Sequence, residues 1–142
     1  MTQEEKQLLF KDLCGRLPYG VICKLSAKDA NVSITEKLDL GGLEHFIFGT
    51  MDVLPYLRPM SSMTEEERRK FSIFIGKTEV YVQQVCLDAD SMANPIIGGG
   101  KCVYWGLFDR CIDWLNEHHF DYRRLIDKGL ALEAPEGMYK TE

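Results

Sequence analysis

The clearest pattern of hydrophobic and polar positions in this chain runs over residues 103–120. At about 100° per residue, its apolar and aromatic side chains fall on one half of a cylinder and its charged side chains fall on the other. This period predicts an α-helix and not a strand. The segment contains both tryptophans, Trp105 and Trp114. We therefore expect it to be the central core helix, lying across a sheet.

Two capping boxes predict the starts of two further helices. Thr2 stands three residues before Glu5, and Thr64 stands three residues before Glu67. At that spacing the hydroxyl and the carboxylate each accept a hydrogen bond from the other residue's backbone N–H. Apolar residues at helical spacing follow both boxes. The predicted helices span about 3–14 and 65–75.

Strands are predicted over 19–26, which is rich in β-branched and aromatic residues, over 32–40, where apolar and polar residues alternate except at Glu36, and over 43–48. Their connections are short, and the pair Gly41-Gly42 resembles a hairpin turn. Connections this short do not allow parallel neighbours. The segment 77–87 is ambiguous and could add a further strand. We therefore expect an α+β fold, in which a meander of three to four antiparallel strands is packed by the 103–120 helix and two further helices.

Length and charge narrow the class of protein. A chain of 142 residues is expected to form a single domain, 1–142. Its net charge of −5 argues against a general affinity for nucleic acid. The N-terminus is acidic, and no segment reaches the roughly 20 apolar residues of a membrane span, so we expect a cytoplasmic protein without membrane contact. Its five cysteines show no C-x-x-C spacing, which fits reduced thiols.

Cys111 and His118 are the candidate ligand or metal residues. They lie seven residues apart, two turns along one face of the predicted helix, and could form half of a zinc site or a thiolate–imidazole pair. The alternative is that both pack as ordinary core residues. The glycines 98–100 precede this helix, but they lack the flanking Gly and Ser or Thr of a phosphate-binding loop. The sequence therefore assigns no cofactor, no metal and no catalytic residue.

A loop is predicted over 51–63, where Pro55 and Pro59 remove two backbone donors. Aromatic residues, Met and Arg are enriched at protein interfaces. The candidate interaction residues of this loop are Tyr56, Leu57, Arg58 and Met60. The alternative is that the loop straps the sheet to the next helix, with Tyr56 and Leu57 packed inward.

Three stretches resemble a family of small uncharacterised proteins carried by gut anaerobic bacteria and their phages or prophages. They are PYGVICKL at 18–25, PYLRPMSSMTEEE at 55–67 and WLNEHHFDYRRLIDKGLALEAPEGMY at 114–139. The family has no assigned activity, so no functional residue carries over. What the resemblance implies is a cytoplasmic accessory protein of a mobile element.

These observations favour a non-enzymatic protein-interaction module with an unknown protein partner. The alternative is a small-ligand or metal-binding protein with its site near Cys111, His118 and the Gly98–Gly100 loop. A homo-oligomer without a ligand is the third hypothesis.

Overall fold

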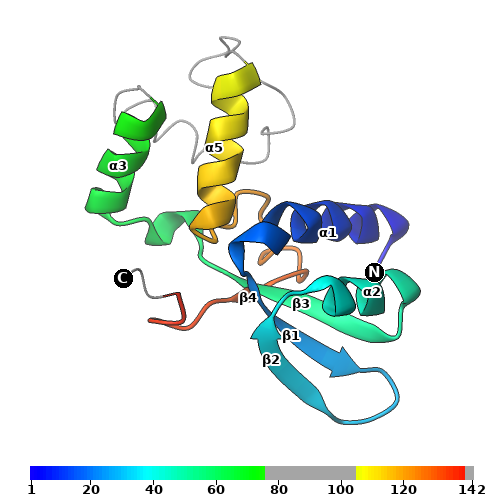
Figure 1. Ribbon diagram of the computed structural model, residues 1–142. Helices are drawn as coiled ribbons and strands as arrows, with labels where there is room; N and C mark the ends of the chain where they lie inside the picture. The colour runs from blue at the N-terminus through cyan, green and yellow to red at the C-terminus, as the bar shows by residue number, and fades with distance from the viewer. Residues whose placement is uncertain (76–104, 140–142) are drawn as a thin grey trace. The chain divides into compact units, whose positions relative to one another are not determined.

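The structure is a computed structural model that describes residues 1–75 and 105–139 (Figure 1). The segment 77–87 and the glycine loop 98–100 lie outside these residues. Contacts divide the chain into two compact units, Met1–Leu57 with Leu125–Glu142, and Arg58–Arg124. Helices and a mixed, mostly antiparallel sheet occur together, which confirms the α+β class. The single domain expected from the length stays a prediction.

The first unit begins with helix α1, Gln3–Arg16. Its predicted capping box is confirmed: the Glu5 N–H donates to the Thr2 hydroxyl at 3.1 Å, and the Thr2 N–H donates to the Glu5 carboxylate at 2.7 Å. Gly15 does not end the helix, because the backbone continues in helical conformation to Leu17. The turn that follows ends at Gly20, whose φ of 69° suits a residue without a Cβ.

The first unit contains a four-stranded sheet in the order β2-β1-β3-β4. Strand β1 pairs antiparallel with both β2 and β3, and β3 pairs parallel with β4. The predicted β1–β2 hairpin is confirmed, but the third strand lies on the other side of β1 and not next to β2 as a meander requires. The strands are β1 Ile22–Ala27, β2 Ser33–Lys37, β3 Met51–Leu57 and β4 Leu132–Glu133.

The strand predicted over 43–48 is wrong, because these residues belong to helix α2, Leu40–Phe48. The Asp39 carboxylate caps its start by accepting from the Gly42 N–H at 2.8 Å. Gly49 ends the helix with a φ of 68°. Residues 41–42 are therefore the first turn of a helix and not a hairpin turn. A short apolar run fits either a strand or a helix, and the two flanking caps decide between them.

The loop predicted over 51–63 is also wrong in its first half, which forms β3. Pro55 lies opposite Cys23 of β1. The hydrogen bonds between β1 and β2 place the backbone groups of Cys23 toward β2, so Cys23 and Pro55 form a pair without hydrogen bonds. The missing N–H of Pro55 therefore removes no bond to β1.

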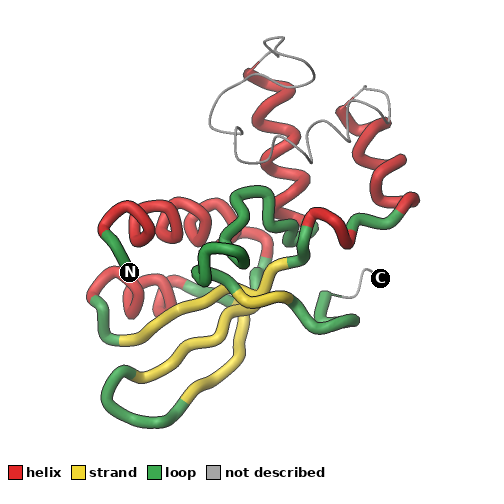
Figure 2. The backbone as a smooth tube through the Cα atoms, turned by 180° about the vertical axis from the view of Figure 1, so that it is seen from behind, coloured by secondary structure: helices red, strands yellow, loops and turns green. Residues whose placement is uncertain are grey.

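Helices α1 and α2 lie on one face of this sheet (Figures 1 and 2). Phe10 of α1 stacks on Phe46 of α2 with ring centroids 6.3 Å apart. On α1, Asp12 and Arg16 form a fully buried ion pair at 2.7 Å. The core cluster of the first unit contains Leu9, Leu13, Val21, Cys23, Leu25, Leu38, Phe46, Val53, Leu57, Leu125, Leu130 and Ala131.

The end of the β1–β3 ladder is closed by Tyr139. Its hydroxyl accepts from the Ile22 N–H at 2.8 Å and donates to the Tyr56 carbonyl at 2.7 Å. These are the two backbone groups that would otherwise bond each other in the ladder. One side chain near the C-terminus therefore satisfies both strands where they separate.

The second unit contains helices α3, Glu65–Ile75, and α5, Trp105–Glu117. The capping box predicted at the start of α3 is confirmed by reciprocal bonds of 3.1 Å between Thr64 and Glu67. The predicted helix over 103–120 is confirmed over 105–117. Its predicted place across the sheet stays a prediction, because α5 belongs to the second unit and the sheet to the first.

Candidate functional site

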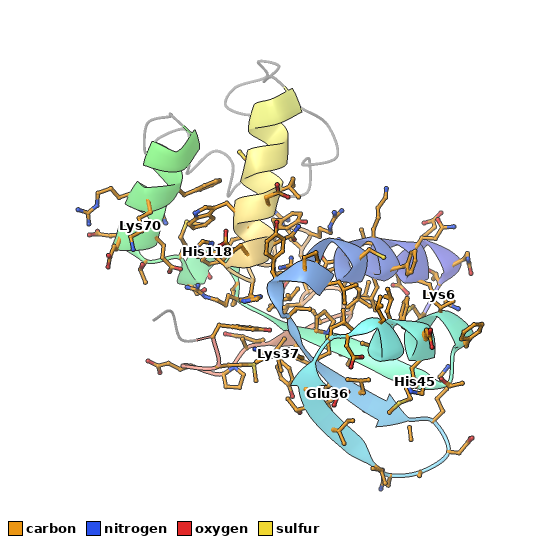
Figure 3. All side chains as sticks on the ribbon, viewed as in Figure 1. Lys6, Glu36, Lys37, His45, Lys70 and His118 are labelled. Carbon is orange, nitrogen blue, oxygen red and sulfur yellow. The ribbon has the colours of Figure 1, made fainter. Side chains whose placement is uncertain are left out.

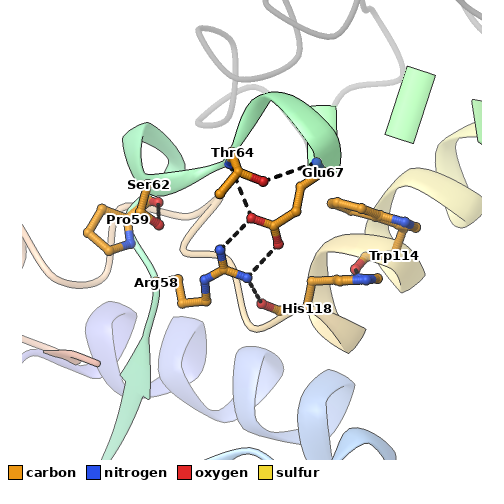
Figure 4. A network of polar contacts seen from close by, with 7 residues as sticks. All are labelled: Arg58, Pro59, Ser62, Thr64, Glu67, Trp114 and His118. Carbon is orange, nitrogen blue, oxygen red and sulfur yellow. Dashed lines mark hydrogen bonds and ion pairs between the residues drawn. The ribbon is translucent and has the colours of Figure 1, made fainter. Parts of the chain in front are cut away.

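Arg58, a predicted interaction residue, makes contacts within the second unit. Its guanidinium donates two hydrogen bonds to the Glu67 carboxylate, at 2.7 and 2.6 Å (Figure 4). It also lies 4.2 Å from the centre of the Phe120 ring. Its backbone bonds to the segment after α5, at 2.8 Å to the His119 carbonyl and 2.8 Å from the Asp121 N–H. Arg58 therefore connects α3 to the end of α5.

The Glu67 carboxylate has two tasks. It is the acceptor for Arg58, and it caps its own helix by accepting from the Thr64 N–H. Burial by itself would raise the pKa of Glu67, but the hydrogen bonds from Arg58 and Thr64 outweigh burial and hold this pKa below its usual value. The charged form is therefore the form that the second unit stabilises.

An aromatic stack lies beside this ion pair. The Trp114 ring lies 4.6 Å from Phe71, 3.9 Å from His118 and 5.9 Å from Phe120, and all three are stacked on it. Phe71, Trp114 and Phe120 are buried, so their stacking contributes to the packing of the second unit.

The structure does not bring Cys111 and His118 together as ligands. The His118 ring stacks on Trp114, and its Nδ1 lies 2.9 Å from the Trp114 carbonyl. Cys111 is fully buried, and burial raises its pKa to about 11. A thiol with this pKa is a poor nucleophile at neutral pH. Among the described residues, no three His, Cys, Asp or Glu side chains could hold a metal ion together.

The other predicted interaction residues lie on either side of Arg58. Leu57 is 0% exposed and belongs to the core of the first unit, so its side chain presents no surface to a partner. Tyr56 is partly buried within β3, and its carbonyl bonds Tyr139. Met60 is partly buried in the short turn Met60–Ser62. The structure thus places these residues in a strand and a turn, in both of which backbone groups are already bonded.

Strand β2 offers a different surface, because it is the end strand of the sheet. Two hydrogen bonds flank β2: the Leu38 N–H donates to the Val21 carbonyl, and the Ala27 N–H donates to the Val32 carbonyl. They show that Val32 and Leu38 turn their backbone groups toward β1. By the alternation of an antiparallel ladder, Ile34 and Glu36 also turn their backbone groups toward β1. Ser33, Thr35 and Lys37 therefore point their N–H and C=O groups away from the sheet, where the described residues supply no partner strand.

All five side chains of β2 are exposed. Figures 1 and 2 show the β1–β2 hairpin extending beyond α1 and α2. Nearby in the chain, helix α2 exposes three apolar side chains of its own. The large exposed apolar residues on β2, next to it and on α2 are Val32 at 60%, Ile34 at 46%, Leu40 at 69%, Ile47 at 46% and Phe48 at 76%.

The alternation over 32–40 predicted the strand but not this surface. Whether a strand lies at the edge or the centre of a sheet depends on pairings with distant residues. The exposed Lys37 at its end, labelled in Figure 3 beside Glu36, is a feature that edge strands often carry.

No family model, curated protein or solved structure matches this chain. Within the part of the chain that the structure describes, no helix has both the length and the apolar character needed to cross a bilayer.

Proposed function

We propose that this chain is a non-enzymatic binding module that takes up an extended segment of a partner protein alongside β2. The observation that carries this proposal is the row of outward-facing backbone groups at Ser33, Thr35 and Lys37 on an exposed end strand. A segment that adds to such an edge gains main-chain hydrogen bonds whatever its sequence is. Side chains then select which segment binds.

The side chains of β2 define the chemistry of the partner. Ile34 lies opposite Leu25, on the face of the sheet that α1 and α2 cover. Ser33, Thr35 and Lys37 lie on the opposite face. A fitting segment is therefore amphipathic with a period of two residues. Its apolar side chains lie on the Ile34 face, where Glu36, opposite Cys23, favours one cationic side chain among them, and its polar side chains lie on the other face.

The resemblance to proteins of mobile elements supports an accessory role of this kind, and a phage or prophage origin is part of the proposal. The alternative, a ligand or metal site near Cys111, His118 and the Gly98–Gly100 loop, stays a prediction, because the loop lies outside the described residues. Burial of the thiol and stacking of the imidazole on Trp114 argue against this alternative.

The proposal can be tested with a displayed library of random twelve-residue peptides, so that the natural partner need not be known. The selecting protein is the full chain, beside the variants Thr35→Pro and Thr35→Val. Proline removes an N–H that faces away from β1 and blocks strand addition at that position. Valine keeps the N–H and the preference for a strand, and it is the matched control.

We expect enriched peptides with alternating apolar and polar residues, which bind the parent and Thr35→Val and lose at least about tenfold in affinity for Thr35→Pro. Hydrogen exchange at Thr35 should slow in the complex. Protected amides at Ile34 and Glu36, which face β1, show that the proline variant keeps its hairpin. Equal binding of the peptides to Thr35→Pro, or no enrichment above background, would overturn the proposal. If the mass in solution rises with protein concentration for the parent and not for Thr35→Pro, the segment that adds to β2 belongs to a second copy of this chain and not to a foreign protein.

A further inference from the structure

The first unit contains a pocket of about 640 Å³. It lies between the start of α1, the end of α2, the first residues of β3 and the turn at 128–130. Its volume falls in the range of about 300–1,000 Å³ that small-molecule sites occupy. None of its residues belongs to β2, so it is a separate feature from the edge described above.

Part of the wall of this pocket is apolar and belongs to the core. Phe46, Val53 and Leu130 line it, and each is at most 6% exposed. They are held by packing in the core cluster of the first unit. This wall is therefore preformed, and an apolar group placed on it would be removed from water without reorganising the core.

The charged residues of the pocket are mainly cationic. Lys6, Lys28 and Lys128 line it, against the carboxylates of Glu5 and Asp52. This excess of cations contrasts with the net charge of −5 of the whole chain. Lys28 forms a long ion pair of 3.9 Å with Asp52. Across residues 1–75 and 105–139, no ion pair involves Lys6 or Lys128.

Lys28 also lies close to the end of α2. A Cβ placed on Gly49 would be 3.8 Å from its Nζ. The ammonium thus lies near the negative pole of α2, which stabilises its charge. Two of the lysines, Lys6 and Lys128, remain available to an anionic ligand. Lys6, on α1, is labelled in Figure 3.

We propose that this pocket binds a small amphiphile that carries an anionic head and an apolar body. The apolar body lies on Phe46, Val53 and Leu130. The anionic head, a carboxylate or a phosphate monoester, is held by Lys6 and Lys128. Neither part suffices alone, because exposed lysines hold a free anion weakly and the apolar wall does not distinguish head groups.

The test titrates the full chain with four probes: decanoate, decyl phosphate, decanol and inorganic phosphate. Decanoate and decyl phosphate are kept below their critical micelle concentrations. Backbone amide shifts in NMR spectra report both affinity and location. We expect decanoate or decyl phosphate to bind and to shift Phe46, Val53 and Leu130. Decanol should bind about tenfold more weakly, and inorganic phosphate should not bind measurably. The two anionic probes distinguish a carboxylate head from a phosphate head.

The variant Lys6→Gln with Lys128→Gln removes both available cations. These side chains are exposed and make no ion pair within the described residues, so the fold should persist. We expect roughly a tenfold loss of decanoate affinity in this variant. The control is Lys11→Gln, an exposed lysine of α1 that does not line the pocket.

Several results would overturn the proposal: decanol binding as tightly as decanoate, an unchanged affinity in the double variant, or shifts confined to residues outside the pocket. A failure of either proposal is distinguishable from a failure of the other. Thr35→Pro should leave decanoate binding unchanged, and the lysine variants should leave peptide binding unchanged.

Discussion

The guanidinium of Arg58 forms a bidentate ion pair with the carboxylate of Glu67, at 2.7 and 2.6 Å, and the same carboxylate caps helix α3 (Figure 4). Both side chains are about one-fifth exposed, so solvent screens the pair only partly. Glu67 thus stabilises the start of α3 and also holds Arg58, at the beginning of the 58–63 segment, against this helix.

Replacement of Glu67 by Gln should lower the stability of the second unit by about 1 kcal/mol at pH 7, because Arg58 loses its charged acceptor. The pKa of Glu67 is lower in the folded chain than its unfolded value of about 4.3. Its contribution is therefore complete above the unfolded pKa and is lost as the pH falls through the folded pKa. Melting temperatures measured from pH 7 to pH 3 should converge for the parent and the variant at the acidic end.

The matched control for this prediction is Glu66→Gln on the same helix. Glu66 pairs with Lys70 at 3.3 Å, but both side chains are about two-thirds exposed or more. Such pairs contribute little, so this variant should melt within about 2 °C of the parent. An equal destabilisation by both substitutions at pH 7 would show that the Arg58–Glu67 pair contributes no more to stability than the exposed Glu66–Lys70 pair.

Replacement of Tyr139 by Phe should destabilise the first unit by about 1–3 kcal/mol, because it leaves the Ile22 N–H and the Tyr56 carbonyl without their shared partner. Burial raises the pKa of the Tyr139 phenol, so the hydroxyl is protonated and able to donate at neutral pH. Urea denaturation measures the loss of stability, and hydrogen exchange should be faster at Ile22.

Tyr56→Phe is the control for the Tyr139 prediction. The Tyr56 carbonyl takes part in the bridge, but its side-chain hydroxyl makes no hydrogen bond within the described residues. Removing that hydroxyl should change the midpoint of denaturation little. If Tyr139→Phe proves as neutral as this control, the hydroxyl does not hold β1 and β3 together.

The native thiols should differ in reactivity. Burial raises the pKa of Cys111 to about 11, and burial together with the Asp12 carboxylate raises the pKa of Cys23 to about 12. Cys14 is exposed on α1. With iodoacetamide at pH 8, we expect Cys14 to be alkylated at least about tenfold faster than Cys23 or Cys111, as measured by peptide mass mapping. Rapid labelling of Cys111 would restore the hypothesis of a reactive thiol there.

Signals that act over a few residues were sufficient to predict several elements. The capping boxes at Thr2 and Thr64 are confirmed, since each depends only on a side chain three residues away. The amphipathic helix over 105–117 is confirmed because its apolar residues recur every three to four positions. The prediction that 43–48 is a strand fails because the Asp39 cap and Gly49 decide a segment whose apolar period is ambiguous.

The sequence by itself thus determined the α+β class, three of the described helices and the β1–β2 hairpin, because hydrogen bonds and side-chain periods within about four residues specify them. Only the tertiary structure decided that β3 pairs with β1, that β2 is the end strand, and that Lys6 and Lys128 line one pocket with Leu130. These relations join residues far apart in the chain, whose pairing follows from how the apolar faces are buried together. Both proposed sites consist of such relations, which explains why the residues singled out from local composition, Tyr56 to Met60 and Cys111 with His118, are not the ones that form them.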